Sequence, residues 1–326
     1  MSKSRAPGNR TIVLSEDEIK TLSPKIIHTE SLKNKIKPDT ILCGDIFEAI
    51  KFVPENSVDL LFLDPPYNLS RKFESNVFNK TTEEKYTEWF DSWFKLLMPS
   101  LKDDASVYVC GDWKTSISIY QVIKNYLKVR NRITWEREKG RGAKTNFKNS
   151  HEDIWFATKS DNYTFNLDDI KMKRKVLAPY RENGKPKDWD ESADGNFRLT
   201  HPSNFWNDIS VPFWSMPENT DHPTQKPEKL VAKLILASTN ENDVVFDPFL
   251  GSGTTAVVAK KLNRRYYGVE LSEEYNMLSY KRLEMAENDT SIQGYFDGVF
   301  WERNTLSAQK KEKVDGKSNP EFQFGS

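Results

Sequence analysis

The stretch that decides the fold reads Val58 Asp59 Leu60 Leu61 Phe62 Leu63 Asp64 Pro65 Pro66 Tyr67 Asn68 Leu69 Ser70. Its first six residues are mostly apolar and predict a buried strand. The two prolines lack N–H groups and fix the backbone, which leaves the carbonyls of Asp64 and Pro65 free to accept hydrogen bonds. Together with the Asp64 carboxylate and the Tyr67 ring, they suit a planar group with an NH2 donor, such as an extruded nucleobase. A strand followed by a plain Pro-Pro turn is the alternative.

Composition bounds the class of protein. The chain has 326 residues, enough for one large domain or two small ones, and 37% of them are hydrophobic. Lys+Arg and Asp+Glu are equal at 48 each, so net charge does not decide for or against a polyanionic partner. Cys43 and Cys110 lie in apolar strand-like runs, which argues against a disulfide or a Cys-rich metal site, and no metal is expected. Without a signal peptide or a long apolar run, we expect a soluble, cytoplasmic protein with no membrane contact.

Strands and helices are predicted to alternate around this stretch. Strands are predicted at 40–43, 57–63, 105–110, 133–135 and 151–157. Helices are predicted at 15–22, 46–53, 81–97 and 116–127, and Thr81 with Glu84 has the spacing of a capping box. An unbroken alternation implies a doubly wound α/β fold with a mostly parallel sheet and right-handed crossovers. Asp45 and Asp64 then lie at the carboxyl ends of parallel strands, the edge where open α/β sheets bind ligands.

A glycine turn marks a second chemical site. Gly251 and Gly253 follow a predicted strand at 243–247 that ends in Asp247, and the next predicted strand ends in Glu270. This is a nucleotide-binding βαβ arrangement, with Glu270 where a ribose-binding carboxylate is expected. The third glycine of the dinucleotide fingerprint is missing, and Asp247 would repel a pyrophosphate but attract an ammonium. The pattern therefore indicates S-adenosylmethionine in preference to NAD.

Two further segments carry candidate polar groups. Thr224 and Lys226 precede a predicted helix whose N-terminus suits a carboxylate or a phosphate. His151 and Glu152 are neighbours on a predicted strand, so they point to opposite faces and are not expected to share a metal.

Basic residues gather in two regions that are candidates for contact with nucleic acid. The first is a Gly-containing loop within 132–148, and the second is the least periodic part of the chain, 167–220. Their Lys and Arg side chains would contact phosphates, and an irregular insertion is where we expect sequence recognition. A solvated loop, and a lid or oligomer contact, are the alternatives. The candidate contacts are Arg137, Lys139, Arg141, Lys144, Lys171, Lys173 and Arg174, and the exposed-looking aromatics of the insertion are Tyr180, Trp189, Phe197, Phe205, Trp206 and Trp214.

The two signatures, in this order, resemble those of the beta group of DNA amino-methyltransferases, in which Asp-Pro-Pro-Tyr precedes the glycine motif of the cofactor site. The resemblance covers about 41–283. It implies a Rossmann-like methyltransferase fold, S-adenosylmethionine as cofactor, and site-specific methylation of a base flipped out of double-stranded DNA. In this family an Asp at the first position is commonest for adenine N6, and a Ser for cytosine N4. Asp64 therefore favours adenine, with cytosine N4 as the alternative.

The resemblance also implies residue roles. Asp64, Pro65, Pro66 and Tyr67 would form a catalytic clamp, in which the amino group donates to the Asp64 carboxylate and the Pro65 carbonyl while Tyr67 stacks on the base. The expected cofactor site borders Asp64 and comprises Asp45 and Ile46 for adenine, Glu270 for ribose, Asp247, Phe249, Gly251, Gly253 and Thr254 for the methionine part, and Thr224 with Lys226 for its carboxylate.

The expected organisation is a flexible basic arm (1–36), a catalytic half (37–166), a target-recognition insertion (167–220), a cofactor-binding half (221–304) and a polar tail (305–326). A homodimer is expected by resemblance, and a restriction-modification enzyme would have a cognate endonuclease acting on the same site, whereas an orphan enzyme would not. Two other classes remain open: a Rossmann oxidoreductase, and a non-catalytic DNA-binding regulator. Within the enzyme class, RNA or a protein glutamine amide are alternative acceptors.

Overall fold

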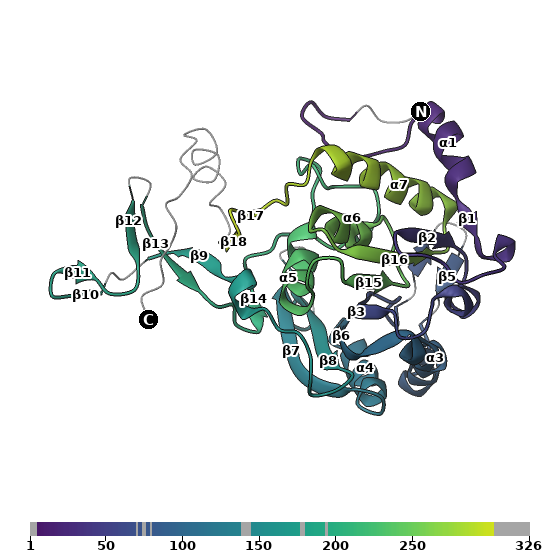
Figure 1. The fold of residues 1–326 in the computed structure, drawn as a ribbon, viewed down its shortest axis with the longest axis horizontal. Coiled ribbons are helices and arrows are strands. Elements are labelled where there is room, and N and C mark those ends of the chain that lie inside the picture. Colours follow the sequence, from purple (N-terminus) through teal and green to yellow (C-terminus); the bar gives the residue numbers. More distant parts are fainter. Residues whose placement is uncertain are drawn as a thin grey trace.

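The computed structural model describes residues 5–69, 71–73, 76–78, 80–137, 145–176, 180–192 and 195–302. Within these residues a nine-stranded sheet in the order β1-β2-β16-β15-β3-β6-β8-β7-β14 organises the chain (Figure 1). Its strands are β1 (Ile27–His28), β2 (Thr40–Cys43), β3 (Val58–Leu63), β6 (Leu101–Gly111), β7 (Lys128–Glu136), β8 (His151–Thr158), β14 (Phe205–Trp206), β15 (Val244–Asp247) and β16 (Arg265–Glu270).

Most neighbouring strands of this sheet are parallel. Each adjacent pair from β1 to β6 runs parallel, as do β7 and β14, whereas β8 is antiparallel to both β6 and β7. The mostly parallel α/β sheet predicted from the sequence is therefore confirmed. The unbroken alternation is wrong at one point, since the described residues between Glu136 and His151 include no helix. Antiparallel neighbours such as β7 and β8 need no crossover helix.

Helices cover both faces of the sheet. Their bounds are α1 (Glu16–Leu22), α2 (Ile46–Ala49), α3 (Glu83–Leu97), α4 (Thr115–Ile123), α5 (Glu228–Ser238), α6 (Thr254–Lys261) and α7 (Glu273–Asn288). Leu60 and Phe62 of β3 face the core that contains α5, α6 and α7, whereas Leu61 and Leu63 face the core that contains α2, α3 and α4. Burial on both faces explains why this strand is continuously apolar.

The N-cap of helix α3 lies one residue later than the sequence indicates. The Thr82 side chain accepts a hydrogen bond from the Lys85 N–H, so Thr82 is the N-cap and the predicted capping box of Thr81 and Glu84 is wrong. The Thr81 N–H instead donates to the Asn68 side chain at 2.8 Å, which ties the start of this helix to the loop after Tyr67.

The N-terminal segment is packed against the body. Ser15 and Glu18 form a capping box at the start of α1, and Ile12 pairs with Thr220 in an isolated bridge. Leu22 and Ile26 are buried in a small apolar cluster with Cys43 and Met277. The expectation of a loosely held arm is therefore wrong for residues 5–36, because their scattered apolar side chains find partners far along the chain.

The insertion forms a second sheet. In the described residues it has five strands in the order β12-β13-β9-β18-β17 and projects from the body (Figure 1). These strands are β9 (Met172–Lys175), β12 (Asp190–Ser192), β13 (Gly195–Thr200), β17 (Tyr295–Phe296) and β18 (Val299–Trp301). Within the insertion, β10 (Arg181–Glu182) and β11 (Lys185–Pro186) form a separate two-stranded sheet. Outside the insertion, β4 (Arg71–Phe73) and β5 (Asn76–Phe78) form another. The irregular character expected of the insertion is thus wrong. Strands β17 and β18 come from residues that the sequence assigned to the cofactor-binding half.

Three of the aromatics expected to be exposed in the insertion are buried, namely Trp189, Phe197 and Trp206. Tyr180, Phe205 and Trp214 are exposed as expected. The polar tail at 305–326 lies outside the described residues. Within the described part of the chain, no helix combines the length and the apolar character needed to cross a bilayer.

Candidate active site

The residues predicted to form the clamp lie together after β3. Asp64 follows β3, which lies between β15 and β6, so its carboxylate emerges at the carboxyl edge of the parallel strands. The Tyr67 hydroxyl donates to Asp64 Oδ1 at 3.0 Å, and the Tyr86 hydroxyl of α3 donates to the Pro66 carbonyl at 3.0 Å. Burial, followed by the nearby Asp64 carboxylate, raises the pKa of Tyr67, so its hydroxyl keeps the proton it donates.

Lys226 reaches the same carboxylate from the segment before α5. Its Nζ lies 2.5 Å from Asp64 Oδ2, 3.4 Å from the Tyr67 hydroxyl and 3.4 Å from Glu152 Oε2. Burial alone would lower the pKa of Lys226, but the carboxylates of Asp64 and Glu152 outweigh it and raise that pKa above its ordinary value. The resemblance gave Lys226 a role at the cofactor carboxylate, whereas its contacts here are with the clamp.

Glu152 is a residue of this site to which the sequence assigned no role. It lies at the start of β8, only 3% exposed, and its Oε1 forms an ion pair with Arg137. Its Oε2 has no hydrogen-bond partner among the described residues. Arg137 also lies over the Trp135 ring, with its guanidinium carbon 5.6 Å from the ring centre. Arg137 lines the same cavity as the clamp, and its expected contact with DNA stays a prediction.

The glycine turn connects β15 to α6. Gly251 and Gly253 have φ of 56° and 86°, the left-handed region that glycine enters without strain. A side chain at Gly251 would place its Cβ 3.0 Å from His222 Nε2, and one at Gly253 would approach Ser279 Oγ to 2.6 Å. Both glycines are therefore required by backbone conformation and by space.

Asp247 and Glu270 hold the turn in shape. Asp247 Oδ2 accepts from the Thr255 hydroxyl at 2.6 Å and Oδ1 from the Phe249 N–H at 2.9 Å. Burial raises the pKa of Asp247 to about 7. The Glu270 carboxylate accepts from the Gly251 N–H at 2.8 Å and from the Ser272 N–H at 2.9 Å.

One cavity of about 490 Å³ joins the clamp to the glycine turn. At one end it is lined by Asp64, Tyr67, Glu152 and Lys226. Its remaining wall includes Asp45, Ile46, Thr224, Phe249, Gly251 and Glu270. Asp247, Gly253 and Thr254 do not line it, although all three belong to the predicted cofactor site. Asp247 accepts hydrogen bonds from residues of the turn and of α6, and Gly253 and Thr254 form the start of α6.

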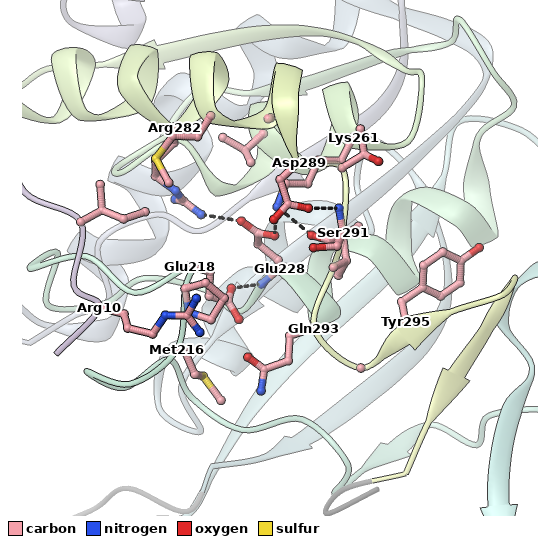
Figure 2. A pocket seen from close by; sticks show the side chains of 18 of the residues that line it. Arg10, Met216, Glu218, Glu228, Lys261, Arg282, Asp289, Ser291, Gln293 and Tyr295 are labelled. Atoms are coloured by element: carbon pink, nitrogen blue, oxygen red, sulfur yellow. Dashed lines mark hydrogen bonds and ion pairs between the residues drawn. The ribbon is translucent and has the colours of Figure 1, made fainter. Parts of the chain in front are cut away.

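The helix N-terminus expected to hold an anion is already occupied. The Glu228 N–H at the start of α5 donates to Glu218 Oε2 at 2.6 Å. Glu218 and Glu228 border a separate cavity of about 630 Å³, shown in Figure 2. Arg282 spans the two regions, donating to Glu228 at 3.0 Å and to the Ser252 carbonyl at 2.8 Å. None of the clamp residues lines this second cavity, so it is distinct from the one at the clamp.

A comparison with protein families decides the identity. The family model described as "DNA methylase", of the N6/N4 type, matches residues 58–281, more than half of the chain. The chain belongs to the N6/N4 DNA methylase family. This family is S-adenosylmethionine-dependent and transfers a methyl group to an exocyclic amine of DNA, as the sequence predicts.

Individual relatives agree with the family assignment. The chain is 34% identical over 251 residues to the type II methyltransferase M.HpaI of Haemophilus parainfluenzae, covering 76% of this chain and 75% of that protein. It is 33% identical over 256 residues to the DNA adenine methyltransferase YhdJ of Escherichia coli (strain K12), covering 76% and 84%. The solved structure of the PvuII DNA methyltransferase (cytosine-N4-specific) matches with a TM-score of 0.58 at 19% identity, over 87% of this chain and 95% of that one. The structural match supports the fold.

The cavity of this DNA methylase fits its cofactor. The wall combines backbone at Gly251, where a side chain would collide with His222, with the hydrogen-bond-accepting carboxylates of Asp45 and Glu270. Such a cradle suits a molecule with hydroxyl and ammonium donors.

Apart from Arg137, the predicted DNA contacts of the methylase divide into two groups. Lys139, Arg141 and Lys144 lie outside the described residues. Lys171, Lys173 and Arg174 lie at or on β9 in the projecting sheet. Lys173 Nζ lies 4.3 Å from the centre of the Trp301 ring, and Lys171 forms an ion pair with Asp168.

Proposed function

We propose that this DNA methylase transfers a methyl group to the exocyclic N6 of an adenine flipped out of duplex DNA. The observation that carries the proposal is the cavity that places the Asp64 carboxylate and the glycine turn at two parts of one wall. An Asp at the first position of the clamp, and the adenine named in the description of YhdJ, both favour adenine over cytosine.

The clamp would activate the amine by hydrogen bonding. An exocyclic amine is a poor nucleophile because its lone pair is delocalised into the ring. The Asp64 carboxylate and the Pro65 carbonyl would accept its two N–H bonds and favour a tetrahedral nitrogen with its lone pair available. The Tyr67 ring would stack on the base. Bound S-adenosylmethionine supplies the electrophilic methyl group, and the Asp64 carboxylate would accept the proton that the amine loses after transfer.

The cofactor subsites follow the cavity wall. Asp45 and Ile46 would contact the adenine ring, and Glu270 the ribose hydroxyls. Phe249, Gly251 and Thr224 would contact the methionine part. Asp247, Gly253 and Thr254 act indirectly in this assignment, because they shape the turn without lining the cavity.

The projecting sheet would contact DNA through β9 and recognise the target sequence. Residues 167–220 with β17 and β18 would thus form the recognition module on the methyltransferase body. A homodimer, and a cognate restriction endonuclease acting on the same site, remain part of this proposal.

Nucleoside analysis of DNA tests the proposed base. Genomic DNA from a methylation-deficient host that expresses the wild-type protein is digested and separated by chromatography with mass detection. We expect N6-methyladenine, and the same host expressing Asp64→Ala should lack it. N4-methylcytosine in its place would overturn the adenine assignment. If neither methylated base is found, the proposed activity itself is overturned.

A further inference from the structure

We infer that Lys226 reads the target base by donating a hydrogen bond to the ring nitrogen next to the reacting amino group. This inference rests on the proposed function and deepens it by naming the edge that the site recognises. That edge is an amidine, N=C–NH2, which is N1, C6 and N6 in adenine and N3, C4 and N4 in cytosine.

A donor and an acceptor lie side by side at the clamp. Lys226 Nζ is 2.5 Å from Asp64 Oδ2, and both residues line the 490 Å³ cavity. An ammonium only donates and an ionised carboxylate only accepts. An amidine edge presents the complement, a ring-nitrogen lone pair beside N–H donors. The base can therefore meet Asp64 and Lys226 at the same time.

Glu152 provides a second countercharge for Lys226. In the part of the chain that the structure describes, Glu152 Oε2 has no hydrogen-bond partner; it lies 3.4 Å from Lys226 Nζ, while Arg137 pairs with the other oxygen. When the amino group of the base donates a hydrogen bond to Asp64, the Lys226 ammonium can turn towards Glu152 and remain paired with a carboxylate. A buried charge is tolerated only with such a partner. Lys226 is thus held in place without being committed to Asp64 alone.

The other polar groups near the clamp fit this role less well. Glu152 lacks a donor when ionised, and the Tyr67 hydroxyl donates to Asp64. The Arg137 guanidinium pairs with Glu152. His222 lies against Gly251 at the glycine turn, and burial lowers its pKa to about 4, so it is neutral at physiological pH.

Single-atom replacement in the base tests the inference. Duplexes with the mapped recognition sequence carry adenine, 1-deazaadenine or 7-deazaadenine at the target, and kcat/KM is measured for wild type and Lys226→Met. The discrimination is the ratio of kcat/KM on adenine to that on 1-deazaadenine. We expect it to be at least tenfold larger in wild type than in Lys226→Met, as for a hydrogen bond to a charged donor. The corresponding ratio for 7-deazaadenine should agree within threefold between the two proteins. For a cytosine target, 3-deazacytosine replaces 1-deazaadenine.

The comparison separates base reading from folding. The deaza substitution also changes the base pairing and the reactivity of the amine. These changes affect wild type and Lys226→Met equally, so they cancel when the discrimination values of the two proteins are compared. Lys20→Met removes an exposed lysine of α1 and should retain the wild-type discrimination. If Lys226→Met does not unfold cooperatively, Lys226→Arg decides. It keeps the charge but moves the donors, so the discrimination should fall at least fivefold.

Two results would overturn the inference alone. The first is a discrimination against 1-deazaadenine that is equal in wild type and in the Lys226 variant. The second is a discrimination that differs between the two proteins for 7-deazaadenine and not for 1-deazaadenine. Loss of S-adenosylmethionine binding in calorimetry, together with unchanged discrimination, would return Lys226 to the cofactor carboxylate. A wild-type protein that methylates neither adenine nor cytosine would overturn the proposed function and this inference together.

Discussion

The Asp64 carboxylate and the Lys226 ammonium lie 2.5 Å apart, although 162 positions separate them in the chain. The first residue follows β3 and the second precedes α5, so this ion pair ties the proposed clamp to the segment that leads into α5. Lys226 is 7% exposed, and removal of either charge would leave the other buried beside fewer partners. The pair therefore joins the two halves of the active site.

Replacement of Asp64 by Ala should abolish methyl transfer while cofactor binding persists. The carboxylate would act on the amino group in the transition state, and loss of one such interaction costs about 100- to 1000-fold in kcat. Transfer of labelled methyl groups to DNA measures activity, and calorimetry measures the affinity for S-adenosylmethionine. Asp17→Ala, at an exposed position of α1, is the control. Wild-type activity in Asp64→Ala would remove this carboxylate from the chemistry.

Cofactor affinity should rise with pH through about 7 because of Asp247. The raised pKa of Asp247, about 7, means that its carboxylate gains negative charge between pH 6 and 8. A negative charge behind the glycine turn attracts the positive groups of S-adenosylmethionine. In Asp247→Asn we expect affinity several-fold weaker at pH 8 and a flatter pH profile, both measured by calorimetry. Identical profiles for wild type and variant would contradict this role.

Glu218 should destabilise the fold above neutral pH. Burial, with the neighbouring Glu228 carboxylate, raises the pKa of Glu218 to about 7 (Figure 2). The unfolded chain releases this proton near pH 4.5, whereas the folded chain keeps it until about pH 7, so stability is lost as pH rises between these values. Glu218→Gln should raise the free energy of unfolding by about 2–3 kcal/mol at pH 8 and by less at pH 5.

Denaturant unfolding at the two pH values measures the effect of Glu218→Gln, with the exposed Glu16→Gln as control. An equal gain at pH 5 and pH 8 would show that the buried charge is not the cause.

Substitution of the β9 cations should weaken DNA binding in a salt-dependent manner. Lys171→Ala, Lys173→Ala and Arg174→Ala would each remove a proposed phosphate contact. The slope of log affinity against log salt should fall by about one for each contact. Fluorescence anisotropy over a salt series gives this slope, and Lys20→Ala on α1 is the control. If all three variants bind like wild type, the projecting sheet does not contact DNA through β9.

The meeting of the clamp and the glycine turn could be predicted from the sequence. Asp64 and Gly251 both follow apolar strands, and the carboxyl ends of parallel strands share one edge. Glu152 could not be assigned in the same way. The sequence indicated that Glu152 and His151 point to opposite faces of the strand. Which of the two faces borders the cavity depends on the pairing of β8 with β6 and β7. A signal was present all the same, since a carboxylate beside a buried apolar run requires a partner.

The projecting sheet was missed for a different reason. Strand β9 reads Met172 Lys173 Arg174 Lys175, without the apolar alternation that marks a strand in sequence. Its pairing with β18, more than 100 residues later, supplies the order. The position of Lys226 depended likewise on a distant partner. Local patterns therefore gave the strands that hold the site, and non-local pairing determined which side chains meet in it.

The most direct test is incubation of the purified protein with methyl-labelled S-adenosylmethionine and unmethylated genomic DNA, followed by mapping of the labelled bases. If the clamp and the glycine turn act as one site, label should appear on adenine N6 within one recurring sequence, and Asp64→Ala should give none. Absence of label from DNA, while the wild-type protein binds both the cofactor and DNA, would contradict the account.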